Sequence, residues 1–202
     1  MSSTVTLRDE LRVFAAHRSP RLIGTAALAA TAARLALGGW RWADLATAAV
    51  ILGLEPFTEW FTHVLLLHSK RDLLVAREHR KHHADPKDRE LVFVPFPILL
   101  VALPVATVLF LGLSDTVRLG LTGLMTSFLM LLTYEWTHHL IHSSYRPKRW
   151  YYRSIRRAHR NHHFRNERYW YGVTINLADV LFRTMPAKDE VPLSPTARTL
   201  GG

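Results

Sequence analysis

The chain has 202 residues, which suits a single domain, and it carries a formal net charge of +10 with 49% hydrophobic residues and no cysteine. The absence of cysteine excludes disulfides, thiolate zinc sites and an iron–sulfur cluster held by the chain itself. A basic chain can bind nucleic acid or an anionic membrane face, but no nucleic-acid-binding module is recognised, so we expect no nucleic-acid partner.

In chain order, a polar and basic segment (1–21) precedes four apolar blocks. A membrane span takes about 20 apolar residues, so we predict an all-α integral membrane protein with about four transmembrane helices, at 22–38, 43–67, 91–113 and 117–141. Two spans with two buried or re-entrant helices are the alternative. Arg34 lies near the outer end of the first block, beside Trp40, where we expect its side chain to reach an interface.

Together with the segments between them, these blocks form one predicted membrane domain, residues 22–186. Residues 68–90 and 142–186 are rich in charged, histidine and aromatic residues, and we expect them to form a helical cap. Residues 187–202 are predicted to be an irregular C-terminal tail.

Lysine and arginine are distributed very unevenly along the chain. Segments 1–21, 68–90 and 146–168 carry 4, 7 and 9 of them, whereas the connections 38–44 and 112–118 carry one each. Cytoplasmic loops are enriched in these residues. With four spans all three basic segments fall on one side, so both termini and the cap are predicted to be cytosolic.

Ten of the twelve histidines form four clusters, or boxes, at helix-compatible spacing: His63/His68, His79/His82/His83, His138/His142 and His159/His162/His163. Residues three and four apart share a helix face, so each of the last three boxes converges. His63 and His68 are five apart, about 140° around an ideal helix. The helix must therefore end near Leu67 or bulge, and we expect it to end there.

Imidazole is a nitrogen ligand suited to iron, zinc and copper, and one ion takes only four to six ligands. Ten clustered histidines therefore predict a di-metal centre within the cap. A solvated basic surface and a zinc store or structural site are the alternatives. His17 is isolated and His139 points about 100° away from His138, so neither is expected to be a ligand.

Two carboxylates lie next to boxes at membrane depth, where an unpaired charge is costly. Glu59 precedes His63 by one turn and Glu135 precedes His138 by three residues. We expect each to accept the N–H of a metal-bound imidazole, with an arginine ion pair as the alternative. Aromatic residues flank the last box, and Tyr152, Trp170 and Tyr171 are predicted to cap the metals and line substrate entry, unless they form an interfacial belt.

The boxes in their sequence context resemble the fatty acid hydroxylase superfamily of membrane di-metal oxygenases, most closely its fatty acid (sphingolipid) 2-hydroxylase branch. The resemblance covers roughly residues 55–186 and rests on Glu59-Trp-Phe-Thr-His63, His79-Arg-Lys-His82-His83, Tyr134-Glu-Trp-Thr-His138, His159-Arg-Asn-His162-His163 and Tyr171-Gly-Val-Thr174. The three-residue gap between His138 and His142 is similar to that of the 2-hydroxylases, whereas carotenoid hydroxylases usually have four residues there.

The resemblance implies an O2-dependent oxidoreductase, a monooxygenase that hydroxylates a lipid acyl chain at C2 of a fatty acyl or N-acyl group. It implies two metal ions, expected to be iron, with zinc able to occupy the site in purified samples. It also implies a separate electron-transfer protein, cytochrome b5-like or a ferredoxin. A sterol or carotenoid hydroxylase or desaturase of the same superfamily is one alternative, and a non-catalytic histidine-rich metal transporter or store is another.

Overall fold

A computed structural model describes residues 5–201, and within that range every regular element is helical, as predicted. Four long helices lie side by side: α2 (Arg18–Leu37), α3 (Trp42–Thr62), α6 (Phe96–Leu113) and α7 (Val117–His142). Residues 1–4 of the predicted N-terminal segment and residue 202 of the predicted tail lie outside the described residues.

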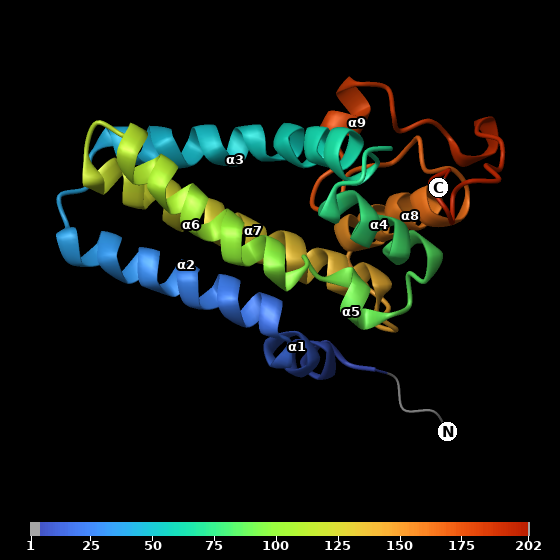
Figure 1. The fold of residues 1–202 in the computed structure, drawn as a ribbon, viewed down its shortest axis with the longest axis horizontal. Helices are drawn as coiled ribbons and strands as arrows, with labels where there is room; N and C mark the ends of the chain where they lie inside the picture. Colours follow the sequence, from blue (N-terminus) through green and yellow to red (C-terminus); the bar gives the residue numbers. More distant parts are fainter. Residues whose placement is uncertain (1–4, 202) are drawn as a thin grey trace.

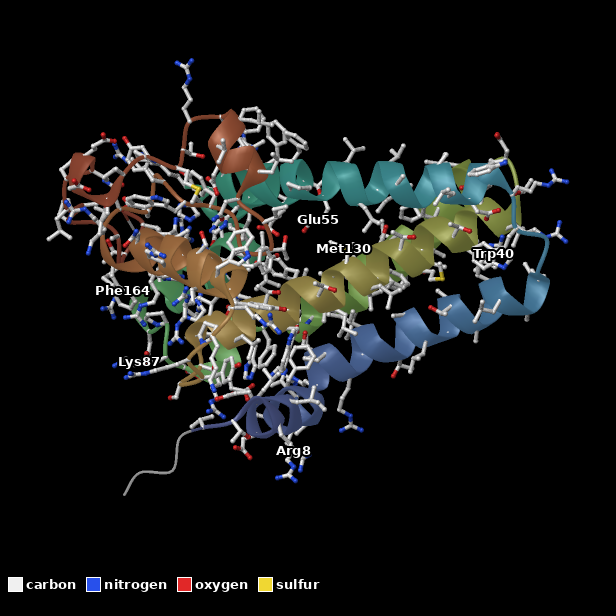
Figure 2. The ribbon with its side chains drawn as sticks, turned by 180° about the vertical axis from the view of Figure 1, so that it is seen from behind. Arg8, Trp40, Glu55, Lys87, Met130 and Phe164 are labelled. Atoms are coloured by element: carbon white, nitrogen blue, oxygen red, sulfur yellow. The ribbon has the colours of Figure 1, made fainter. Side chains whose placement is uncertain are left out.

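The short elements gather at one end of this bundle (Figure 1). They are α1 (Leu7–Ala16), the π-helical turn η1 (His63–Leu67), α4 (Leu74–Ala84), α5 (Arg89–Val92), α8 (Trp150–Phe164), α9 (Leu177–Leu181) and the 3₁₀ turn η2 (Lys188–Glu190). The tight connections at 38–41 and 114–116 lie at the opposite end. Figure 2 shows the same polarity, with Trp40 at one end and Arg8, Lys87 and Phe164 at the other.

The helix boundaries follow from local chemistry. Gly38, with φ of +51°, ends α2 in a conformation that favours glycine. The Thr116 side chain accepts the backbone N–H of Leu119 and so caps the start of α7. Between such signals the apolar runs form helices of 18 to 26 residues, and α3 and α6 continue through Pro56 and Pro104.

Helix α7 is at the centre of the bundle and packs against α2, α3 and α6. Its contact with α2 and α6 buries an aliphatic and aromatic core: Ile23, Ala27, Ala30, Leu99, Leu103, Leu124 and Phe128. Gly120 and Gly123 allow α6 to approach closely, because a Cβ on Gly120 would lie 2.7 Å from the Phe110 carbonyl oxygen.

The outward faces of the long helices are apolar yet exposed, with Leu28 at 73% and Val108 at 70% exposure. Three helical stretches are long and apolar enough to cross a membrane: Trp42–Leu67, Arg89–Leu113, which includes the break between α5 and α6, and Val117–His142. Helix α2 is not among them, so the fourth span remains a prediction.

Arg34 corrects an expectation about α2. Instead of reaching an interface, it is fully buried, donating from Nη2 to Asp44 Oδ1 at 2.7 Å and from Nε to Thr122 Oγ1 at 2.8 Å. The Trp40 ring covers the guanidinium at 3.8 Å. Because a fixed carboxylate partner lies on α3, the charge is neutralised inside the bundle and joins α2, α3 and α7 at the end remote from the histidines.

Candidate metal centre

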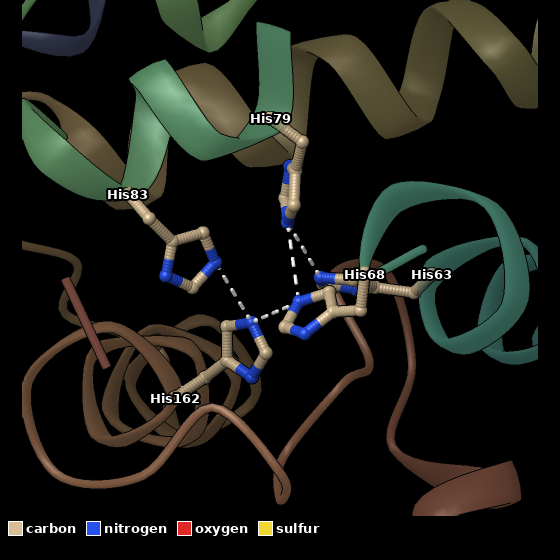
Figure 3. A group of neighbouring side chains, drawn as sticks. All are labelled: His63, His68, His79, His83 and His162. Atoms are coloured by element: carbon tan, nitrogen blue, oxygen red, sulfur yellow. Dashed lines mark hydrogen bonds between the residues drawn. The ribbon is translucent and has the colours of Figure 1, made fainter. Parts of the chain in front are cut away.

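The ten box histidines converge at the histidine-bearing end of the bundle and separate into two groups of five. Within each group, one ring nitrogen from each of the five histidines lies within 4.8 Å of the others. We call them the first group (His63, His68, His79, His83 and His162) and the second group (His82, His138, His142, His159 and His163). Figure 3 shows the first group, with its rings pointing inward from three separate helical segments.

The boxes do not map onto the groups one to one. In α4, His79 and His83 belong to the first group while His82 belongs to the second. In α8 the pattern is reversed, since His162 joins the first group and His159 and His163 the second. Residues i and i+4 lie closer in angle than either does to i+3, so each helix lies between the two groups and serves both.

The His63/His68 pair converges through a π turn. The backbone N–H of His68 donates to His63 O at 3.0 Å, a bond five residues long, and the helix ends at Leu67. A π turn takes more residues per turn than an α turn, so side chains five apart come to the same side. The sequence offered two alternatives, a helix that ends near Leu67 or a helix with a bulge. Both features are present, because the helix ends at Leu67 in a π turn.

The tautomers of three first-group rings are fixed by backbone carbonyl oxygens. Nδ1 of His63, His83 and His162 donates to Tyr171 O, Ala197 O and Tyr169 O at 2.7, 2.7 and 2.8 Å. A neutral imidazole has one donor nitrogen, so Nε2 of each carries a lone pair. Yet Nε2 of His162 faces Nε2 of His83 at 3.2 Å. Two facing lone pairs repel unless a cation lies between them.

The spacing of the nitrogens also fits a shared ion. Nε2···Nε2 distances are 3.2–3.3 Å in the first group and 3.0–3.1 Å in the second. Two nitrogens about 2.1 Å from one ion, at about a right angle, are separated by about 3 Å. In the second group, Nε2 of His82 and His138 is buried without a hydrogen-bond partner. The donor set of each group therefore could hold a metal ion.

The protonation state agrees with metal binding. Burial lowers the pKa of His83 to about 4 and holds the pKa values of His79, His82, His159 and His162 well below the ordinary value. The rings are thus neutral near pH 7, which is the form that coordinates metals.

Glu59 and Glu135 act differently from the expectation that they accept an imidazole N–H. Glu135 accepts Val94 N at 2.6 Å and Ser19 Oγ at 2.9 Å. Two residues before Val94, the carbonyl oxygen of Val92 accepts Nδ1 of His138 at 2.7 Å. The carboxylate therefore holds the segment whose carbonyl orients the ring, and the His138 imidazole bonds to a main-chain oxygen instead of the carboxylate.

Glu59 has the same indirect role on the other side of the centre. It accepts the backbone N–H groups of Val173 and Thr174 and the Thr174 hydroxyl. Asp179, for which the sequence predicts no role, accepts Tyr171 N at 3.0 Å and Gly172 N at 2.6 Å. The two carboxylates fix the loop whose carbonyls orient His63 and His162. A Cβ at Gly172 would lie 2.9 Å from Asp179 Oδ2, so the close approach of this carboxylate requires glycine. The glycine in the Tyr171-Gly-Val-Thr174 run is therefore the feature of the sequence that could have indicated this contact.

The three aromatic residues predicted to cap the metals, Tyr152, Trp170 and Tyr171, have different surroundings in the structure. The Tyr171 ring lies 5.4 Å from the His63 and His162 rings, between centroids, and covers the first group. Trp170 is buried against Ala158 and Val191 and donates to Pro186 O, so it supports the loop. Tyr152 lies against Tyr151, at 5.1 Å between centroids. Its predicted contact with substrate stays a prediction.

The two histidines excluded from the boxes lie outside both groups. His139 is buried, with Nε2 3.0 Å from Glu10 Oε2 on α1. His17 caps α2, accepting Ser19 N at 3.2 Å, and stacks on Phe93 with 3.9 Å between centroids. Both fasten the N-terminal segment to the rest of the molecule.

A family model described as fatty acid hydroxylase matches residues 48–184, a range that includes all ten box histidines. The chain belongs to the fatty acid hydroxylase family. The predicted resemblance is therefore confirmed, and the expected oxidoreductase class is confirmed at the level of the family.

Individual relatives in this family are 2-hydroxylases. The dihydroceramide fatty acyl 2-hydroxylase FAH2 of Arabidopsis thaliana is 33% identical over 68% of this chain and 60% of that protein. The fatty acid 2-hydroxylase of Mus musculus is 29% identical over 67% of this chain and 38% of that protein. The matched part thus spans less than two thirds of these relatives.

A solved structure supports the fold of this fatty acid hydroxylase family member. Full-length Scs7p, in which only the hydroxylase domain is visible, matches with a TM-score of 0.74 at 21% identity. The match covers 87% of this chain and 68% of that one.

A cavity of about 380 Å³ opens beside the two histidine groups. Its inner wall includes His79 of the first group and His82 and His138 of the second. The remaining lining is mainly apolar, from Leu67, Leu74, Val75 and the run Leu91–Pro97, with His17, Arg18, Glu78 and Glu90 as polar groups. A small molecule in this cavity can therefore touch both groups at once.

Proposed function

We propose that this chain is a membrane-bound di-iron monooxygenase that hydroxylates a lipid acyl chain at C2 of a fatty acyl or N-acyl, sphingolipid-like substrate. One observation carries the proposal: a mainly apolar cavity reaches both five-histidine groups. When bound, redox-active ions supply the O2-dependent oxidation of an unactivated C–H bond, which zinc, without redox chemistry, does not.

The protein's part in this reaction is to position the chain and keep water out. The cavity volume of about 380 Å³ is near the lower end for small-molecule sites. It can take the start of an acyl chain, while the rest of the lipid lies outside. Arg18 and Glu90 give the cavity polar groups for a headgroup. This arrangement favours oxidation of a carbon close to the headgroup.

Four spans with the centre on the cytoplasmic side are part of the proposal. Helix α2 has 20 residues, about 30 Å, which is enough to cross the hydrocarbon core. Its one internal charge, Arg34, is buried and paired with Asp44, which reduces the cost of crossing. The 20-to-2 lysine and arginine bias supports a cytoplasmic cap and cytoplasmic termini.

The electrons are proposed to come from a separate acidic protein, such as a cytochrome b5-like protein or a ferredoxin. Helix α8 carries three box histidines on its inner face, whereas Arg153, Arg157 and Arg160 are exposed on its outer face. These arginines line a hollow together with Arg156 and Lys188, and its described lining includes no carboxylate. A donor bound there by charge complementarity would be one helix away from the ligands.

The test of the proposed activity is a comparison of host lipids with and without the gene. Mass spectrometry should find 2-hydroxy acyl chains only when the intact protein is made. His159→Ala, which removes a second-group ligand, should abolish the product while leaving the protein in the membrane.

An unchanged fraction of 2-hydroxy acyl chains would overturn the substrate assignment. New sterol or carotenoid oxidation products would instead identify a sterol or a carotenoid as the substrate. Activity retained by His159→Ala would overturn the enzyme assignment. Metal analysis separates a transporter or store, because an enzyme centre should hold a fixed two ions per chain.

A further inference from the structure

The C-terminal tail lies across α8 and reaches α4, at the histidine-bearing end of the bundle (Figure 1). Ser194 N donates to Arg165 O at 2.7 Å, and Thr196 Oγ1 donates to Glu167 Oε1 at 2.6 Å. Val191 and Ala197 are buried. The tail follows the range 48–184 that the family model matches.

The tail ends its path on a single box residue, His83. The carbonyl oxygen of Ala197 accepts Nδ1 of His83 at 2.7 Å. Arg198 donates from Nε to His83 O at 3.0 Å and from Nη2 to Ala84 O at 2.5 Å. The tail therefore binds both the ring and the backbone of the same residue, and the Phe164 ring of α8 lies 5.6 Å below the guanidinium.

These contacts have a direct consequence for the ring. A proton held on Nδ1 by the Ala197 carbonyl leaves Nε2 free to face the other first-group nitrogens, with His162 Nε2 3.2 Å away. The Tyr171 and Tyr169 carbonyls orient His63 and His162 from the loop after α8. Of these three oriented rings in the first group, His83 is the one that depends on the tail.

We propose that residues 194–198 form a positioning element for one metal only, the ion of the first group, by fixing the tautomer and direction of His83. This inference rests on the proposed function, since it takes each group to hold an ion. Losing a partner that orients a ligand typically weakens metal binding about 10- to 100-fold. The second group has no hydrogen bond to residues 194–198 in the described part of the chain.

The test measures metal binding, independently of turnover. The purified metal-free chain is titrated anaerobically with Fe²⁺ against a chelator of known affinity, and bound iron is counted by elemental analysis. The variants are Arg198→Ala and a chain ending at Ser194. Leu193→Ala, in the same tail and 71% exposed, is the control. Circular dichroism checks that the helices remain.

The wild type and Leu193→Ala should bind two ions tightly. Arg198→Ala and the shortened chain should keep one tight ion and bind the other about 10- to 100-fold more weakly. Arg198→Lys, which keeps one charged donor group in place of the two guanidinium N–H donors, should bind the second ion with an affinity between those of the wild type and Arg198→Ala.

Two results would overturn the inference: variants that bind both ions like the wild type, or variants that lose both ions together. If the wild-type chain itself fails to bind two ions, the proposed di-metal function fails first. If the wild type binds two ions and the variants bind them equally tightly, only the proposed role of the tail is refuted.

Discussion

His82 and His83 are adjacent in the chain but belong to different groups, because their side chains leave α4 on different sides. Double variants test this division. His79→Ala/His83→Ala removes two proposed ligands from the first group and should leave one ion per chain. His82→Ala/His83→Ala removes one proposed ligand from each group and should weaken both ions.

Elemental analysis after chelator challenge measures the difference between these two double variants. His139→Gln, outside both groups, is the control and should retain two ions. Equal iron content in the two double variants would contradict the division of α4 between the groups.

Glu59 is predicted to stabilise the fold through the backbone N–H groups that it accepts. Glu59→Ala leaves the N–H groups of Val173 and Thr174 without their acceptor. An unsatisfied buried donor costs about 1–3 kcal/mol, so the free energy of unfolding in detergent should fall by about that amount. Glu59→Gln, which keeps an acceptor oxygen, should lose less.

Thr58→Ala is the matched control for Glu59, because the Thr58 side chain is exposed and bonds only within its own helix, to Glu55 O. Its change should stay within about 0.5 kcal/mol. A Glu59→Ala variant as stable as this control would refute the supporting role of the carboxylate.

The sequence predicted the ten histidines because imidazole itself is the signal. It did not predict what orients them. Glu59 and Glu135 were correctly selected as unusual, but the segments they bind, 173–174 and 94, come close only in the folded chain. The role of Ala197 could not be predicted from the sequence, because every residue has a carbonyl oxygen and the residue type does not indicate which carbonyl accepts a histidine N–H.

At the scale of the element, the helix boundaries were largely predictable and the helix contacts were not. Apolar runs define α3, α6 and α7, and Thr116 caps the start of α7. The contact between α6 and α7, however, depends on Gly120, whose added Cβ would lie 2.7 Å from a backbone oxygen. The burial of Arg34 likewise needed Asp44 and Thr122 to meet it, which no local pattern encodes.

Two glycine substitutions should therefore have opposite effects. Gly120→Ala forces α6 and α7 apart and should destabilise the protein by about 1–3 kcal/mol. Gly24→Ala, within α2 and with no atom within 4 Å of the new Cβ, should stabilise it by about 0.5–1 kcal/mol. Thermal unfolding in one detergent measures both, and equal shifts would show that α6 and α7 do not pack this closely.

At the scale of the whole molecule, the absence of native cysteine makes topology testable by thiol labelling. Single cysteines at the exposed positions Leu11, Lys70 and Asp115 report on the N-terminal segment, the connection after η1 and the connection between α6 and α7. With four spans, a membrane-impermeant maleimide added to intact cells should label Asp115→Cys alone. Lys70→Cys and Leu11→Cys should react only after permeabilisation.

The Leu11→Cys variant decides the status of α2, the helix that sequence hydropathy alone leaves open. If it labels from outside while Lys70→Cys does not, α2 fails to cross and three spans remain. Labelling of Lys70→Cys in intact cells would instead reverse the orientation of the metal centre.

The π turn at His63–Leu67 has an evolutionary consequence. It uses one residue more than an α turn to bring His63 and His68 together, whereas His138 and His142 achieve the same in regular α-helix. Losing one residue from this turn would convert it to an α turn and leave the two imidazoles one turn apart. A one-residue deletion at this point would thus keep both imidazoles on one side of the helix, so the gap length within this box records the type of turn that carries it.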